Sequence, residues 1–158
     1  MKGKPEVLAE LSDRLKEELA AINQYILHAE MCENWGYLRL AKQTKQEAIG
    51  EMKHAERIVE RILFLEGMPR MDQMAKITIG KNVKQQLEND LALEKGAVED
   101  YNKSIEICRH AGDNATADFF KEILQDEEEH VDTLETELSM IEQMGLENYL
   151  AQQIPEPD

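Results

Sequence analysis

The sequence predicts an all-α protein: a four-helix bundle with one long crossover and a short fifth helix at the C-terminal end. Apolar residues recur at spacings of three and four along almost the whole chain, which is the period of amphipathic helices. Residues that favour helices dominate, and only 8 Gly and 4 Pro interrupt them. No segment alternates apolar and polar residues as a strand does. A length of 158 residues indicates a single domain, residues 1–158.

The first two helices are predicted to form a hairpin. The first begins near Pro5, because proline suits the first turn of a helix, and ends near Gly36. The second follows at once and ends near Gly67 and Pro69, which disfavour its continuation. Residues 67–82 show weak periodicity and are predicted to be a long connection. The apolar stripe of the first helix is Leu8, Leu11, Leu15, Leu19, Ile22 and Ile26.

Caps and breaks define the helices of the second half. Asn82 is a suitable N-cap for a third helix. Residues 112–114, Gly-Asp-Asn, break this helix and cap a fourth, which is predicted from about Ala115 to Met144. A short fifth helix is predicted from about Glu147 to Gln153. Two hairpins with short turns, joined by one long crossover, form a four-helix bundle of the predicted connectivity.

The chain is strongly acidic, with 18 Lys and Arg against 33 Asp and Glu and a formal net charge of −15. This charge argues against nucleic acid and anionic membranes as partners and suits the collection of cations. Acidity that merely keeps the protein in solution is the alternative. No apolar run approaches the length of a membrane span, and residues 1–6 do not resemble a signal peptide. Cys32 and Cys108 are too few for a disulfide framework, so we expect reduced thiols and a cytoplasmic protein.

The two halves of the chain are related by a shift of 76 residues. The matching positions include apolar, aromatic and charged residues, which indicates two copies of one helical hairpin related by an approximate two-fold axis. The matching pairs are Leu11/Leu87, Leu15/Leu91, Glu18/Glu94, Ala21/Ala97, Tyr25/Tyr101, Cys32/Cys108, Gly36/Gly112, Glu51/Glu127 and His54/His130.

One glutamate lies on the apolar stripe of each predicted long helix. These glutamates are Glu18, Glu51, Glu94 and Glu127. His54 and His130 follow the second and the fourth of them by three residues, so each hairpin contains one Glu-x-x-His. This spacing places both side chains on one helix face, about 5–6 Å apart at Cβ, where both can reach one ion.

These six side chains predict a site for two metal ions. Four ionised carboxylates in a dry core repel one another, and few Lys or Arg residues lie on these stripes to neutralise them. Two divalent ions neutralise them, and carboxylate with imidazole suits iron or manganese, with zinc as an alternative. Di-iron and di-manganese carboxylate bundles use this ligand set, a Glu from each of two helices and a Glu-x-x-His from each of the others. The alternative is that each Glu-x-x-His lies on the surface and binds no metal. The motif occurs twice, beside two further inward Glu, and this counts against the alternative.

The pattern also suggests a role for each ligand. Glu51 and Glu127 are placed to bridge two metals about 3.5–4 Å apart. The remaining ligands divide into two sets, Glu18 with His54 and Glu94 with His130. Two Fe(II) ions held in this way can pass two electrons to dioxygen or peroxide.

Three further side chains near these stripes carry polar groups. Tyr25 lies seven residues after Glu18 on the same stripe. It is placed either to donate a hydrogen bond to a ligand carboxylate or to donate an electron, and a buried core tyrosine is the equal alternative. His28 and His110 have no such surroundings and are expected to be structural or exposed.

The chain resembles bacterioferritin over essentially its whole length, including Met1, Lys2 and Gly3. The matching segments are residues 18–25, 51–55, 61–67, 126–130, 134–138 and 144–150. The resemblance implies the ferritin-like fold and ferroxidase activity, the oxidation of Fe(II) to Fe(III) with dioxygen or peroxide at a di-iron centre. It also implies a homo-oligomeric shell of 24 subunits, built from dimers, that stores ferric mineral, and a ferredoxin-type reductant for iron release.

The resemblance further implies haem b, shared between two subunits through one methionine from each. Met52 matches that position. A step of one residue from Glu51 turns about 100° around the helix, so Met52 points away from the predicted metal site, as an interface residue does. On the residues alone, Met52 is a packing residue.

Three positions depart from the family pattern. Gln46 and Gly50 stand where many members carry His and Asp on the inner surface, and Thr133 stands where Trp is common. These departures count against an additional inner-surface iron site and against an aromatic electron relay. The six predicted ligands are intact.

Two other functions share these features. A di-metal peroxidase or di-manganese catalase has the same bundle, although a rubrerythrin-like chain would add a Cys-x-x-Cys module that this sequence lacks. The second alternative function is that of a non-enzymatic, haem-binding shell subunit, because some family members divide the haem and ferroxidase duties between subunits. A chain that keeps Met52 and all six ligands favours both duties in one subunit.

Overall fold

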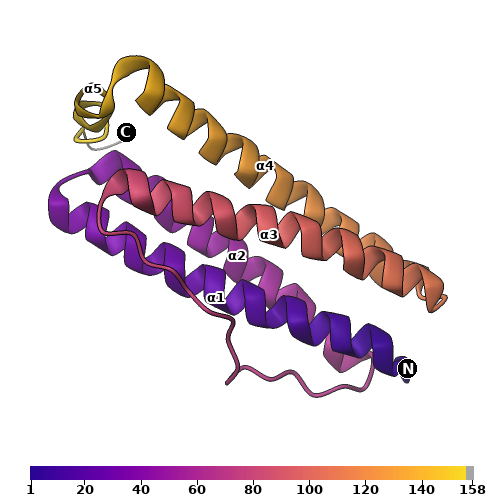
Figure 1. Cartoon of the computed structure of the whole chain (residues 1–158). Coiled ribbons are helices and arrows are strands. Elements are labelled where there is room, and N and C mark those ends of the chain that lie inside the picture. The colour runs from indigo at the N-terminus through magenta and orange to yellow at the C-terminus, as the bar shows by residue number, and fades with distance from the viewer. Residues whose placement is uncertain (156–158) are drawn as a thin grey trace.

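The computed structural model describes residues 1–155 and shows long helices packed lengthwise as two hairpins (Figure 1). In chain order the helices are α1 (Pro5–Trp35), α2 (Leu38–Phe64), α3 (Val83–His110), α4 (Asn114–Met144) and the short α5 (Leu146–Ala151). The prediction of an all-α four-helix bundle with a short fifth helix is confirmed. The predicted domain, residues 1–158, also includes residues 156–158, which lie outside the described part. Within residues 1–155, no helix combines the length and the apolar composition that crossing a membrane requires.

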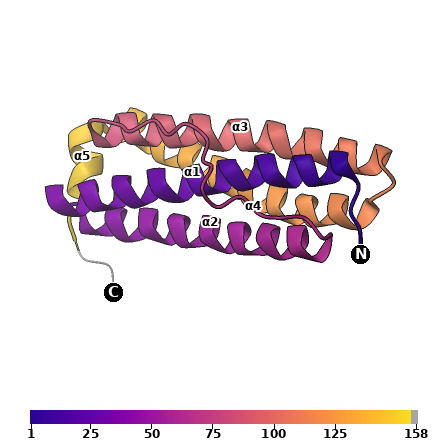
Figure 2. The same ribbon diagram turned by 90° about the horizontal axis from the view of Figure 1, so that it is seen from below.

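One long connection, residues 65–82, returns the chain along the whole bundle. As a result, α3 begins beside the end of α1 that leads into α2 (Figures 1 and 2). Side chains of α1 hold this crossover in place. The backbone N–H of Thr78 donates to Gln24 Oε1, and the backbone N–H of Gly80 donates to His28 Nε2, both at 3.0 Å.

The two remaining histidines have structural or exposed positions, as expected. His28 is 1% exposed, and its Nδ1 lies 2.9 Å from Asp90 Oδ1. Because Nε2 accepts the N–H of Gly80, Nδ1 carries the proton and donates it to Asp90. His28 therefore joins α1, α3 and the crossover. His110 is exposed, and its Nδ1 lies 2.9 Å from the backbone carbonyl oxygen of Glu106 in its own helix.

Local signals explain where the helices begin and end. Gly36 has a φ of 92°, a left-handed conformation that glycine adopts without strain, and it ends α1. Asn82 accepts a hydrogen bond from the backbone N–H of Gln85 at 2.9 Å and caps α3. Asp113 caps α4 in the same way through Thr116, also at 2.9 Å.

The structure shifts four of the predicted helix ends by one to a few residues. Because Asp113 is the cap, α4 begins at Asn114, one residue before the predicted start. Helix α2 ends at Phe64, ahead of Gly67, and the turn that follows holds Glu66 at a φ of 62°. The short α5 begins one residue earlier and ends two residues earlier than predicted.

A layer of acidic residues divides the apolar core into two main clusters. One cluster includes Leu11 and Phe120, and the other includes Leu87 and Tyr149. The prediction that Ile26 faces inward is wrong, since this side chain is 40% exposed. A step of four residues turns a helix about 40° beyond a full turn, so the predicted stripe drifts out of the core.

Candidate metal centre

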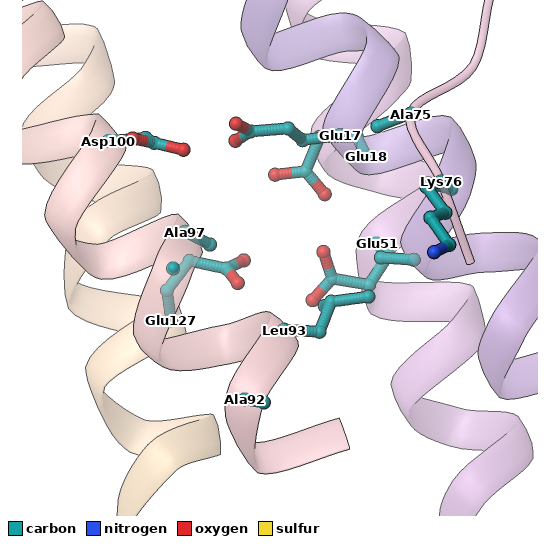
Figure 3. Close-up of a pocket in the computed structure, with 13 residues that line it drawn as sticks. Glu17, Glu18, Glu51, Ala75, Lys76, Ala92, Leu93, Ala97, Asp100 and Glu127 are labelled. Atoms are coloured by element: carbon teal, nitrogen blue, oxygen red, sulfur yellow. The ribbon is translucent and has the colours of Figure 1, made fainter. Parts of the chain in front are cut away.

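Four glutamates, one from each long helix, converge in the middle of the bundle. They are Glu18 of α1, Glu51 of α2, Glu94 of α3 and Glu127 of α4. Their relative exposures are 2%, 1%, 0% and 1%, so water barely reaches them. Figure 3 shows the carboxylates of Glu18, Glu51 and Glu127 pointing into one cavity between the helices. The helical period that sets these residues on apolar stripes directs them to this common point.

Two histidines direct their Nδ1 atoms at the same point. His54 Nδ1 lies 3.0 Å from Glu127 Oε1 and 3.6 Å from Glu18 Oε2. His130 Nδ1 lies 2.9 Å from Glu51 Oε1. These atoms are close, yet their angles do not make hydrogen bonds, and both Nδ1 atoms lack a partner within residues 1–155.

The six side chains form two overlapping sets, each compact enough to surround one ion. One set is Glu18, Glu51, His54 and Glu127, and the other is Glu51, Glu94, Glu127 and His130. Within each set the candidate ligand atoms all lie within 4.8 Å of one another. Glu51 and Glu127 belong to both sets, which is the position that a bridging ligand occupies. The structure thus brings together all six side chains that the sequence predicted as ligands.

Each of these six side chains has one buried atom without a hydrogen-bond partner in the described part of the chain. The atoms are Glu18 Oε2, Glu51 Oε1, His54 Nδ1, Glu94 Oε2, Glu127 Oε1 and His130 Nδ1. An unpaired buried polar atom costs about 1–3 kcal/mol, and more when it is charged. Native structures therefore leave few such atoms. Carboxylate oxygens and imidazole nitrogens are good ligands for iron, manganese and zinc, so this donor set fits a pair of such ions.

Without metal, the glutamates must share protons. Burial, and then the carboxylate of Glu51, raises the pKa of Glu18 well above its usual value. Burial, and then the carboxylates of Glu94 and Glu18, raises the pKa of Glu127 in the same way. Burial also opposes ionisation of Glu51, but the neighbouring Glu18 and the two imidazoles outweigh it and lower its pKa. Burial and the mutual repulsion of the carboxylates therefore oppose full ionisation of the cluster.

The histidines respond in the opposite direction. Burial alone would lower the pKa of His54, but the nearby carboxylates of Glu127 and Glu18 outweigh it and raise the pKa. The same balance, with Glu47 as the main carboxylate, raises the pKa of His130. The carboxylates thus favour the protonated form of both imidazoles. A divalent ion displaces such protons, because a metal ligand must be deprotonated.

Carboxylates hold the far side of both imidazole rings. His54 Nε2 lies 2.8 Å from Asp126 Oδ2, and His130 Nε2 lies 3.0 Å from Glu47 Oε2. A ring whose Nε2–H donates to a carboxylate leaves Nδ1 free to bind an ion once it loses its proton. These contacts therefore fix the orientation in which Nδ1 faces the cluster.

Two tyrosines donate to the glutamates that belong to one set only, each to one carboxylate oxygen. The Tyr25 hydroxyl donates to Glu94 Oε1, and the Tyr101 hydroxyl donates to Glu18 Oε1, both at 2.5 Å. The two side chains are 2% and 0% exposed. Tyr25 thus makes the hydrogen bond to a predicted ligand that was one of its expected roles.

Three residues around the cluster lie outside the sequence prediction of the site: Tyr101, Asp126 and Glu47. The internal repeat held a signal for Tyr101, because the shift of 76 residues pairs it with Tyr25. The same shift pairs Asp126 with Gly50 and Glu47 with Ile123, so the repeat gives no signal for the two carboxylates.

A cavity of about 180 Å³ connects the carboxylates with the surface between α1 and α3 (Figure 3). Glu17 and Asp100 face each other across it, and Lys76 of the crossover lies at its side. Burial, and then the neighbouring carboxylate of Asp100, raises the pKa of Glu17 to about 8. The walls are made of small side chains: Ala20, Ala21, Ala92, Gly96 and Ala97. The cavity is therefore an acidic path to the cluster.

The one buried arginine of α1 does not neutralise the cluster. Arg14 is 7% exposed, and its guanidinium pairs with Glu17 at 3.0 Å. It also donates to the Ser104 hydroxyl at 2.8 Å. These contacts hold the charge of Arg14 beside the cavity, away from the glutamates that converge in the bundle.

Met52 lies on the outside of α2. It is 41% exposed, and Ile49, one turn earlier, is 44% exposed. Its thioether is therefore accessible to a group outside the subunit, and it points away from the buried cluster as the helical period predicts. A soft sulfur donor at this position fits a haem iron.

Comparison with known proteins identifies the family. Residues 8–144 match the family described as Ferritin-like domain. The bacterioferritin of Brucella melitensis biotype 1 is 46% identical over 149 residues, which cover 94% of this chain and 92% of that protein. The bacterioferritin of Mycolicibacterium paratuberculosis is 43% identical over 157 residues, 99% of both chains. That of Streptomyces coelicolor is 40% identical over 151 residues, 96% of this chain and 90% of that protein. This chain therefore belongs to the bacterioferritins, a ferritin-like family of iron-storage proteins.

Proposed function

We propose that this chain is the ferroxidase subunit of an iron-storage shell. It oxidises Fe(II) to Fe(III) with dioxygen or hydrogen peroxide and delivers the product to a ferric mineral inside 24 subunits. The observation that carries the proposal is the group of six buried ligand atoms without partners in residues 1–155, arranged as two overlapping sets. A cluster that served only the fold would pair these atoms with one another.

The side chains of the chain bind the ions and keep water away. The shared ligands are Glu51 and Glu127, and the single-ion ligands are Glu18 with His54 and Glu94 with His130. Iron bound there supplies electrons to dioxygen or peroxide. As ions bind, the protons held by the glutamates and histidines are released. Asp126 and Glu47 keep the imidazole rings turned toward the cluster.

Fe(II) reaches the site through the acidic cavity between α1 and α3. Asp100 and, once it is ionised, Glu17 attract cations at the cavity, and the buried carboxylates hold them. The net charge of −15 favours the approach of cations over the whole surface. Tyr25, one hydrogen bond from Glu94, supplies an electron as well as fixing that carboxylate.

The exposed Met52 binds haem b together with the same residue of a second subunit, and electrons for iron release come from a ferredoxin-type reductant. Met52→Leu should abolish the haem absorption spectrum without preventing shell assembly. Met68→Leu is the control, because Met68 is 76% exposed and lies in the crossover. A Met52→Leu spectrum identical to that of the parent protein would remove Met52 from the haem site.

The central test compares Fe(II) oxidation by Glu127→Gln with that by Glu128→Gln, a neighbouring exposed position. Loss of a shared ligand should slow oxidation by at least about tenfold, since even changes in outer residues weaken metal sites 10–100-fold. Running the assay with dioxygen and with peroxide separately identifies the oxidant. If the parent protein oxidises Fe(II) no faster than buffer does, the chain is a non-enzymatic shell subunit. Peroxide turnover by the iron-free, manganese-loaded protein would favour a catalase instead.

A further inference from the structure

The two tyrosines of the metal centre are exchanged between the hairpins. Tyr25 of α1 donates to Glu94 of α3, and Tyr101 of α3 donates to Glu18 of α1. On its own helix each tyrosine lies seven residues, about 10 Å, beyond the glutamate, so only the opposite glutamate is within reach. Both carboxylates that the proposed function assigns to a single ion thus carry a phenol on one oxygen.

Both phenols are sealed from water, with exposures of 2% and 0%. A buried phenol needs one acceptor, and any carbonyl or hydroxyl inside the bundle would satisfy it. In both halves the acceptor is instead a carboxylate of the metal centre. At 2.5 Å both hydrogen bonds are short. Each bond offers the phenol proton an acceptor at the moment when the ring loses an electron.

Full reduction of dioxygen needs two electrons more than the two Fe(II) ions supply, which is the number that two tyrosines can donate. Reduction of dioxygen to two water molecules takes four electrons, and two Fe(II) ions supply two of them. We propose that Tyr101 is a second electron donor beside Tyr25, so that one centre reduces dioxygen fully to water. Hydrogen peroxide is then not released.

In this reaction, dioxygen, two Fe(II), two tyrosines and two solvent protons give two water molecules, two Fe(III) and two neutral tyrosyl radicals. Each phenol loses one electron to dioxygen and its proton to the carboxylate that it faces. The two phenol protons and the two solvent protons form the four O–H bonds of the product water. The O–O bond breaks as the third and fourth electrons arrive.

Arg14 makes the two donors unequal. Its Cζ lies 5.9 Å from the centroid of the Tyr101 ring. A cation is attracted to the electron-rich ring of the phenol, and this attraction weakens when the ring loses an electron, so Tyr101 is the harder of the two to oxidise. Within residues 1–155, Tyr25 has no such contact. Tyr101 is therefore the second tyrosine to react.

The inference rests on the proposed ferroxidase function, and radical spectroscopy on the full chain tests it. Metal-free protein, with or without ring-deuterated tyrosine, is loaded with two Fe(II) per subunit without oxygen, mixed with dioxygen and frozen. Tyr25→Phe should keep about half of the parent's tyrosyl spins, with a spectrum that narrows on deuteration. The double variant Tyr25→Phe/Tyr101→Phe should lose this signal and release about one hydrogen peroxide per dioxygen.

Tyr149→Phe is the matched control, because Tyr149 is also buried and donates to a carboxylate, that of Glu137, outside the cluster. It should leave the radical yield unchanged. A Tyr25→Phe protein without a tyrosyl signal, or with the signal of the double variant, would overturn the inference. Weaker Co(II) binding by Tyr101→Phe with an unchanged radical yield would also overturn it, because Tyr101 would then only position Glu18. A parent protein that fails to oxidise Fe(II) would instead overturn the proposed function.

Discussion

Replacing Glu127 with glutamine tests whether the acidic cluster is kept for metal at the expense of stability. Glu127 is 1% exposed. Burial is the largest cause that raises its pKa, followed by the carboxylates of Glu94, Glu18 and Glu51. Glutamine has nearly the same shape and no charge. The variant therefore removes the buried acid without opening a cavity.

The size of the effect is limited by the proton that the folded, metal-free protein must hold. In the unfolded chain the Glu127 carboxyl has a pKa near 4.5 and is ionised at pH 7. Keeping it protonated at that pH costs at most about 3 kcal/mol, since one pH unit corresponds to about 1.4 kcal/mol. Because the folded-state pKa is raised, this cost is absent below pH 4.5 and grows as the pH rises toward the folded-state pKa.

Metal-free Glu127→Gln is therefore expected to be more stable than the parent at neutral pH and similar to it in acid. For a chain of this length about 1 kcal/mol moves Tm by roughly 2–4 °C, so the gain is at most roughly 6–12 °C. The assay is thermal unfolding at fixed protein concentration, with and without Co(II). Metal at a hundredfold excess over its Kd should stabilise the parent by about 2.7 kcal/mol and the variant by much less.

Glu128→Gln is the control for this experiment, because Glu128 is exposed on the same helix. It should change neither the metal-free stability nor the gain from Co(II). A metal-free Glu127→Gln protein that is less stable than the parent at pH 7, and that gains as much from Co(II), would refute the reasoning. The carboxylate would then serve the fold and not a metal.

Three further predictions concern the path to the centre and the residues around it. Gly96→Leu should slow Co(II) binding, measured by stopped flow, because Gly96 lines the cavity. Gly50→Leu is the control, because an added Cβ meets nothing within 4 Å at either position and Gly50 does not line the cavity. Equal binding rates would mean that ions enter elsewhere. Asp126→Asn should weaken Co(II) binding about 10–100-fold in calorimetry, because His54 loses the carboxylate that orients its ring; parental affinity would contradict this role. Raising the pH through about 8 should speed Co(II) uptake, because Glu17, whose pKa burial raises to about 8, then ionises beside the cavity. Glu17→Gln should flatten this pH dependence, and an unchanged profile would remove Glu17 from the path.

The sequence alone determined which glutamates and histidines face inward and which helices carry them. Glu18 and Glu51 could be placed on buried faces because a helix repeats every 3.6 residues, so residues three or four apart share a face. The same rule paired Glu51 with His54. Caps such as Asn82 bounded the helices to within a residue or two, because capping is a local hydrogen bond. The internal repeat then predicted that both halves serve one centre.

Only the tertiary structure decided which residues meet across the helices. Tyr25 reaches Glu94 and not Glu18, and His54 reaches Asp126, because the packed helices have a particular axial offset and rotation. The period of a single helix does not contain these two quantities. They arise from the interlocking of side chains along the whole length of both hairpins. The ligand set can therefore be predicted from the pattern of residues along the sequence. The orientation of the ligands, their hydrogen-bonded surroundings and the path to the surface depend on how the four helices pack together.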